Sequence, residues 1–288
     1  MTTTTKINTG QSTSADDDPK INTASAASVY QQLRGHLAVL KLHTAAEQLP
    51  TVLDAATAHG LTLTAALEQL LRLEVDATEA RRLAGRLRFA CLPTPATLDG
   101  FDYDAAAGVD PHLVAELGTC RYLDSATNVI LIGPPGVGKT HLAVGLGRAA
   151  AEAGYRTYFT TAADLAARCH RAALEGRWAT TMRFFAGPTL LVIDELGYLP
   201  LPGEAAAALF QVVSQRYLKT SIVITTNRGV GAWGDILGDT TVAAALLDRL
   251  LHRSVVLNLD GDSYRLRDHH ARNNQLRQTT TGTRQPLR

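Results

Sequence analysis

A glycine-rich stretch in the middle of the chain has the residue types and spacing that hold a phosphate. Residues 133–140 read GPPGVGKT, which matches the pattern G-x-x-x-x-G-K-S/T. Glycines let backbone N–H groups turn toward one anion, Lys139 can reach the β- and γ-phosphates of a nucleotide, and the Thr140 hydroxyl can bind Mg²⁺. A chance glycine-rich turn is the alternative, but a strand predicted before the stretch and a helix predicted after it favour a phosphate site. The residues expected to contact the nucleotide are Gly133, Pro134, Pro135, Gly136, Val137, Gly138, Lys139, Thr140 and His141.

An acidic pair ends a second apolar run, LLVIDE at residues 190–195. Ligands of α/β proteins bind at the carboxyl ends of the strands, so both carboxylates are expected near the glycine-rich stretch. We expect Asp194 to hold Mg²⁺, mostly through water, and Glu195 to polarise the water that attacks the γ-phosphate. A helix N-cap would account for Asp194 alone, but it explains the pair poorly.

A third polar group, Asn227, follows the apolar run at residues 221–226. At the end of a strand it would lie between the carboxylates and the γ-phosphate, where it could orient the water. Asn also forms turns, and that alternative stays open.

The elements that must position these groups alternate between strands and helices. Strands are predicted at 128–132, 156–161, 190–194, 221–226 and 254–259, and helices at 140–153, 162–173, 204–218 and 241–251. Continuous apolar strands that alternate with helices predict an α/β fold whose parallel sheet is covered on both faces.

The region before the first strand is helical and reads as a separate small domain. Apolar residues recur at helical spacing until Cys91, where the sequence CLPTP breaks the helix. The predicted organisation is a disordered tail at 1–28, a helical N-terminal domain at 29–92, a linker with a helix from Pro111 at 93–127, the nucleotide-binding domain at 128–268, and a flexible tail at 269–288.

Composition excludes several classes of protein. Three cysteines without paired spacing argue against a disulfide framework or a zinc site. No apolar run approaches the roughly 20 residues that span a bilayer, and the first residues contain no apolar signal segment. We expect a cytoplasmic protein with no membrane partner.

Further motifs give the chain a specific resemblance. They are GPPGVGKTHLA (133–143), LLVIDELGYLP (190–200), LFQVVSQRY (209–217), TTNRG (225–229), LLDRLLHRS (246–254) and DSYRLR (262–267). With these motifs the chain resembles the IstB family of transposition helper ATPases, relatives of the helicase loader DnaC and the initiator DnaA, from about residue 29 to residue 267.

The resemblance implies an AAA+ P-loop ATPase with a five-stranded parallel sheet, in which the strand before Asn227 lies between the other two site strands. It also implies that Arg249 reaches the γ-phosphate of a neighbouring subunit as an arginine finger, and that Arg265 senses nucleotide. An ion pair of Arg249 with Asp248 or Glu204 is the alternative. Only 288 − 259 = 29 residues follow Leu259, too few for the helical lid of most AAA+ proteins. The implied cofactors are ATP and Mg²⁺, and the implied catalytic residues are Lys139, Glu195, Asn227 and Arg249.

Four arginines at the end of the helical domain are candidates for DNA contact: Arg81, Arg82, Arg86 and Arg88. An ordinary solvated helix face explains them as well, because acidic residues lie just upstream. The resemblance favours phosphate contact, since helpers of this family assemble on duplex DNA with little sequence preference.

Three functional hypotheses follow. The first is an ATPase that forms a homo-oligomer with ATP and duplex DNA and delivers the DNA to a cognate DDE transposase. The second is a DnaC-like loader of a replicative helicase, whose main partner is a protein. The third is an ATP-binding module without hydrolysis, against which Glu195 and Arg249 argue because binding alone requires neither.

Overall fold

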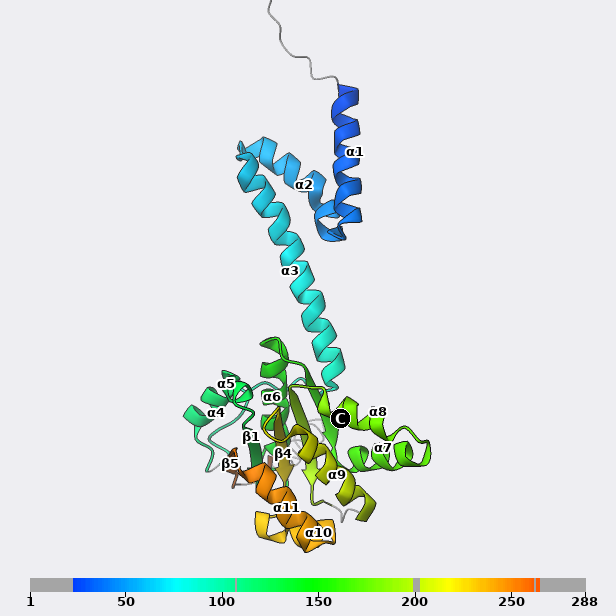
Figure 1. Ribbon diagram of the computed structural model, residues 1–288. Helices are drawn as coiled ribbons and strands as arrows, with labels where there is room; N and C mark the ends of the chain where they lie inside the picture. Colours follow the sequence, from blue (N-terminus) through cyan, green and yellow to red (C-terminus); the bar gives the residue numbers. More distant parts are fainter. Residues whose placement is uncertain (1–22, 107, 199–202, 262, 265–288) are drawn as a thin grey trace, which may run out of the picture. The chain divides into compact units, whose positions relative to one another are not determined.

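The computed structural model describes residues 23–106, 108–198, 203–261 and 263–264 (Figure 1). Internal contacts divide the chain into two compact units, Met1–Ala80 and Arg81–Arg288. The division falls inside helix α3 (Leu63–Ala90), so the four candidate arginines belong to the second unit. The greater part of both predicted tails lies outside the described residues, and so does Arg265.

The first unit is helical, as its apolar spacing predicts. Helices α1 (Thr23–Val39) and α2 (His43–His59) and the first part of α3 enclose a small core. Helix α1 begins at Thr23, earlier than residue 29, where we expected the helical domain to start. The buried Glu74 of α3 accepts a hydrogen bond from the Ala45 backbone N–H at 2.9 Å. Because this N–H lies in the first turn of α2, Glu74 supplies the cap that α2 lacks in its own sequence.

A five-stranded parallel sheet organises the second unit. Its strands are β1 (Asn128–Ile132), β2 (Thr157–Thr161), β3 (Leu190–Leu196), β4 (Ser221–Thr226) and β5 (Ser254–Asn258). The strand order is β2-β3-β4-β1-β5. Strand β4 therefore lies between β1 and β3, which confirms the expected place of the strand that ends before Asn227.

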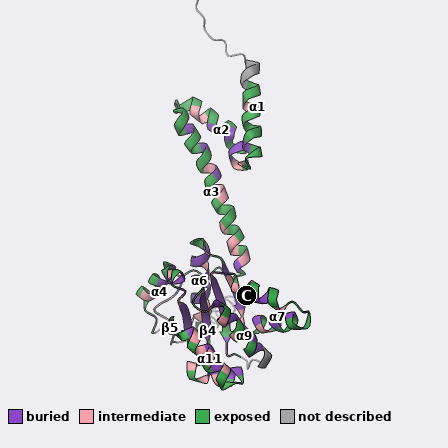
Figure 2. Ribbon diagram, viewed as in Figure 1, coloured by how far each residue is buried: buried purple, intermediate pink, exposed green. Residues whose placement is uncertain are grey.

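Alternation along the central strands produces two cores. Val129 and Leu131 join the core on one face, whereas Ile130 of the same strand joins the core on the other face. Figure 2 shows the strands buried and the helices around them exposed on their outer sides. These observations confirm the predicted parallel sheet with both faces covered. The prediction was possible because strands buried on both faces are continuously apolar in the sequence.

Helices cover both faces of this sheet. They are α4 (Pro111–Gly118), α5 (Arg121–Asp124), α6 (Lys139–Glu152), α7 (Ala162–Leu174), α8 (Trp178–Ala186), α9 (Gly203–Arg216), α10 (Trp233–Leu237) and α11 (Thr240–Leu251), with a 3₁₀ turn at Val230–Ala232. The sequence predicted α4, α6, α7, α9 and α11 within a few residues. We did not predict α5, α8 and α10, which are short and lack a long apolar period. Among the described residues, no helix combines the length and apolarity needed to cross a bilayer.

Arg216 fixes the end of the sheet opposite the glycine-rich stretch. It is 1% exposed, and its guanidinium donates to the carbonyls of Phe185, Pro188, Thr189 and Ser221 at 2.7–3.4 Å. Burial lowers the pKa of Arg216 to about 9, so the group stays charged at neutral pH. One cation thus joins α8, β3, α9 and β4 by satisfying backbone carbonyls that the fold buries.

Replacing Arg216 by Met is expected to destabilise the second unit by at least about 3 kcal/mol, because each buried carbonyl left without a donor costs about 1–3 kcal/mol. Both tryptophans, Trp178 and Trp233, lie in this unit, so fluorescence-detected urea unfolding measures its stability. The exposed Arg183 of α8 is the matched control: Arg183→Met is expected to change stability by less than about 0.5 kcal/mol. Equal stabilities of the two variants would contradict this role for Arg216.

Candidate functional site

The glycine-rich stretch forms the turn between β1 and α6, as its sequence predicts. Gly136 and Gly138 have φ angles of 92° and 95°, a region that side chains with a Cβ rarely occupy. Helix α6 begins directly after this turn, at Lys139. The turn therefore presents backbone N–H groups and the positive end of a helix dipole to the same space, an arrangement that binds phosphate.

Lys139 is held at this turn by backbone carbonyls. Its Nζ donates to the carbonyl oxygens of Gly133 and Pro134 at 2.7 and 2.6 Å. These bonds keep the ammonium beside the cavity, where it can meet the β- and γ-phosphates of a nucleotide. Gly133 and Pro134 thus act through their carbonyls, whereas residues 135–141 line the cavity itself.

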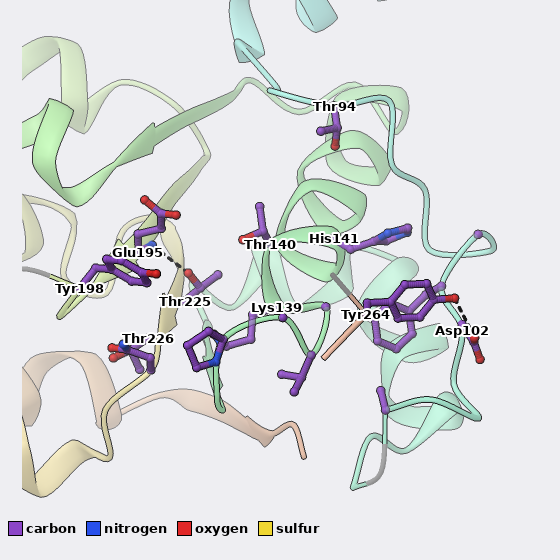
Figure 3. A pocket seen from close by; sticks show the side chains of 18 residues that line it. Thr94, Asp102, Lys139, Thr140, His141, Glu195, Tyr198, Thr225, Thr226 and Tyr264 are labelled. Carbon is purple, nitrogen blue, oxygen red and sulfur yellow. Dashed lines mark hydrogen bonds between the residues drawn. The ribbon is translucent and has the colours of Figure 1, made fainter. Parts of the chain in front are cut away.

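A cavity of about 540 Å³ opens above this turn (Figure 3), a volume typical of small-ligand sites. Its lining brings together residues that are distant in the sequence: Thr94, Gly100, Phe101, Asp102, Ala106, residues 135–141, Glu195, Tyr198, Thr225, Thr226, Asn227 and Tyr264. Figure 3 shows Glu195, Tyr198 and Thr225 on one side of Thr140, and His141, Tyr264 and Asp102 on the other.

The predicted linker contributes one wall of this cavity, which the sequence analysis missed. A Cβ built on Gly138 would lie 2.6 Å from the Phe101 ring, so the linker packs directly against the turn. His141 stacks edge-on against Phe101, with ring centroids 5.6 Å apart, and its Nε2 donates to the Thr97 carbonyl at 2.9 Å. The two aromatic residues of the sequence GFDY, Phe101 and Tyr103, were the available signal, since linkers seldom place aromatic residues in a core.

The segment after β5 also packs against the turn, next to the linker. The Tyr264 backbone N–H donates to the Gly136 carbonyl at 3.0 Å, and its hydroxyl donates to the Asp102 carboxylate at 2.7 Å. A Cβ on Gly136 would lie 2.2 Å from Ser263 Oγ. Tyr264 therefore ties the turn to the linker across the edge of the cavity (Figure 3).

The acidic pair lies at the carboxyl end of β3, as expected. Asp194 is buried, and the Thr140 hydroxyl lies 3.1 and 3.2 Å from its two carboxylate oxygens. A hydroxyl and a carboxylate are ligands that Mg²⁺ accepts when substrate phosphates and water supply the rest. The described residues contain no group of three or more His, Cys, Asp or Glu side chains suited to a metal. By their ligand types alone, the Thr140 hydroxyl and the Asp194 carboxylate fit Mg²⁺ held together with a nucleotide.

Glu195 and Asn227 line the cavity beside this pair. Glu195 is exposed and has a φ angle of 61°, which is uncommon for a residue with a side chain. Asn227 Oδ1 is buried and has no hydrogen-bond partner among the described residues. An unpaired buried acceptor and a carboxylate that line one cavity are groups that can hold a water molecule.

Arg249 does not line the cavity of its own chain, as far as the described residues define it. On α11 its guanidinium donates to the Ala245 carbonyl at 2.8 Å and lies 4.8 Å from the centroid of the Phe210 ring. Glu204, one of the two acids that could form an ion pair with Arg249, has its side chain outside the described part of the structure.

The four candidate DNA-contacting arginines differ in their surroundings. Arg86 is half-buried, and its Nε donates to the Ala151 carbonyl at 2.7 Å, so it anchors α3 on the end of α6. Arg81, Arg82 and Arg88 are exposed. We therefore keep these three as candidates and assign Arg86 a structural contact.

Comparison with known proteins adds a family. The model of the IstB-like ATP binding protein family matches residues 35–272. The ATP-binding protein of insertion sequence IS5376 from Geobacillus stearothermophilus is 42% identical over 229 residues, which cover 80% of this chain and 91% of the relative. The ATP-binding protein of insertion sequence IS21 from Pseudomonas aeruginosa is 38% identical over 232 residues, which cover 81% and 88%.

Solved structures share the fold. AMPPCP-bound DnaA from Aquifex aeolicus has a TM-score of 0.50 and 21% identity, covering 60% of this chain and 53% of that one. DnaI also has a TM-score of 0.50, with 15% identity and coverage of 58% and 92%. At these identities the likeness shows the fold alone.

Proposed function

Because the chain belongs to the family of IstB-like ATP binding proteins, we propose that it is an ATP-dependent helper of transposition. In this proposal it assembles on target duplex DNA, delivers that DNA to a partner transposase and hydrolyses ATP. The insertion-sequence origin of its relatives favours this function over the loading of a replicative helicase. We place it in the cytoplasm, where its three free cysteines stay reduced.

The observation that supports hydrolysis is that Glu195 and Asn227 line the same cavity as Thr140. Binding ATP needs the turn, Lys139 and a place for Mg²⁺. Glu195 is not needed for binding, yet its carboxylate lines the cavity where it can polarise a water molecule. Asn227 presents an unpaired oxygen that can orient the same water. When bound, Mg²⁺ would neutralise charge on the β- and γ-phosphates.

Arg249 is the residue that would make hydrolysis depend on assembly. Lys139 is a single charge, and the charge that spreads over a transferring phosphoryl group needs more than one cation. Arg249 lies outside its own cavity, so we propose that it completes the cavity of a neighbouring subunit. Hydrolysis would then require an oligomer, and duplex DNA would promote it by gathering subunits.

Two substitutions separate binding from hydrolysis. Lys139→Ala is expected to weaken ATP binding about 10- to 100-fold, because charge-assisted hydrogen bonds contribute about 1.5–3 kcal/mol. Glu195→Gln is expected to keep ATP affinity and to lose at least about 100-fold in turnover, since the amide cannot accept the proton. ATP binding and phosphate release with duplex DNA are measured separately. Wild-type turnover in Glu195→Gln would refute the role of Glu195.

Exposed arginines at the end of α3 are expected to contact DNA phosphates. The double variant Arg82→Glu, Arg88→Glu should bind duplex DNA more weakly on every sequence, and the salt dependence of its affinity should flatten by about one unit for each lost contact. The variant Arg121→Glu, Lys219→Glu carries the same change of charge at other exposed positions. If both variants lose affinity and slope equally, the effect is one of net charge, and Arg82 and Arg88 belong to a solvated face.

Mixing two inactive variants tests whether Arg249 acts in a neighbouring subunit. Arg249→Ala should bind ATP normally and lose about 10³-fold or more in hydrolysis. Lys139→Ala subunits keep Arg249 and can supply it to the intact cavity of Arg249→Ala subunits. Phosphate release by the mixture should therefore recover in part, with mixed oligomers verified by differently tagged chains. No recovery in verified mixed oligomers would contradict action between subunits.

A further inference from the structure

Strand β3 contains a β-bulge at the acidic pair. The register with β4 is fixed by the pairs on either side, Ile193 with Ile224 and Leu196 with Thr226. Two residues of β3, Asp194 and Glu195, therefore face one residue of β4, Thr225. One extra residue on one strand is the definition of a bulge, and bulges redirect side chains next to active sites.

The bulge decides where the two carboxylates point. In a regular strand, successive side chains point to opposite faces of the sheet, which would separate neighbouring acids. Here the left-handed backbone of Glu195, with φ of 61°, leaves Asp194 buried against Thr140 while Glu195 lines the cavity. Such a conformation is unfavourable for a residue with a Cβ, so it persists only where surrounding contacts hold it.

The Thr225 hydroxyl makes the contacts that hold Glu195 in this conformation. It accepts the backbone N–H of Glu195 at 2.9 Å and donates to Asp194 Oδ1. These roles are fixed, because an N–H can only donate and an ionised carboxylate can only accept. Thr225 is 1% exposed, so water has little access to either bond.

We propose that Thr225 is a positioning residue for ATP hydrolysis. Its hydroxyl holds the bulge, so that Glu195 faces the cavity and Asp194 is oriented with Thr140 toward Mg²⁺. This inference rests on the proposed hydrolysis and assigns a task to a residue that acts through Glu195 and Asp194. The ordinary explanation for Thr in a strand is its β-propensity, which Val would satisfy equally well.

Thr225→Val tests the hydroxyl, because Val keeps the shape and removes both bonds. Turnover is expected to fall about 10- to 100-fold, as it does when the hydrogen-bond partner of a metal ligand is lost. ATP affinity without Mg²⁺ should stay within about threefold of wild type, since the turn and Lys139 are untouched. The Mg²⁺ concentration that gives half of the metal-dependent gain in ATP binding should rise about tenfold. Thr225→Ser should restore most of both properties.

Thr157→Val is the matched control. Thr157 is a fully buried threonine of β2 whose hydroxyl has no hydrogen-bond partner among the described residues and does not line the cavity. The Thr157→Val protein should have the turnover and the Mg²⁺ dependence of ATP binding of the wild type. If the Thr225→Val protein does not fold, judged by its melting curve, Thr225→Ala replaces it with less volume on the strand.

The outcomes separate this inference from the proposed function. Wild-type turnover and Mg²⁺ dependence in Thr225→Val, or no recovery in Thr225→Ser, would overturn the role of Thr225. A wild-type protein that binds ATP but releases no phosphate with DNA would contradict the proposed hydrolysis. The Mg²⁺ titration of ATP binding would still decide whether Thr225 orients Asp194.

Discussion

A parallel sheet buried on both faces constrains everything else in the second unit. All its strands end at the same edge, and the order β2-β3-β4-β1-β5 sets β1, β4 and β3 side by side there. The turn after β1, the acids of β3 and Asn227 after β4 consequently meet at one cavity, although almost a hundred residues separate them in the chain. The chemistry depends on this convergence, since each group alone is an ordinary turn, cap or strand end.

Both phosphate binding and packing require glycine at positions 136 and 138 of the turn. Phosphate binding needs backbone N–H groups that point inward, and Gly136 and Gly138 provide the necessary positive φ angles. Packing makes a separate demand, because Ser263 and Phe101 occupy the space that a Cβ at these positions would need. The motif therefore depends on its protein neighbours as well as on its ligand.

Sequence alone predicted the parallel sheet and the residues of the turn, because continuous apolar strands and a spaced motif are local signals. The place of the strand before Asn227, between the other two site strands, came from the family resemblance and not from a local signal. Sequence could not predict the bulge at Glu195, which arises from pairing with Thr225 across the sheet. It treated the segment around Phe101 as a linker, because the contact with Gly138 depends on how the chain folds back. The bond of Arg86 to the end of α6 was missed for the same reason. Contacts between distant segments leave no periodic trace in a sequence.

The segment between α3 and Phe101 is fixed at both ends within the second unit. At one end Arg86 bonds to the Ala151 carbonyl, and Phe89 packs 5.7 Å from Tyr158 and 6.2 Å from Phe184. At the other end Phe101 packs against the nucleotide turn. The helix that carries the exposed arginines and the wall of the ATP cavity are thus parts of one continuous, anchored stretch of chain.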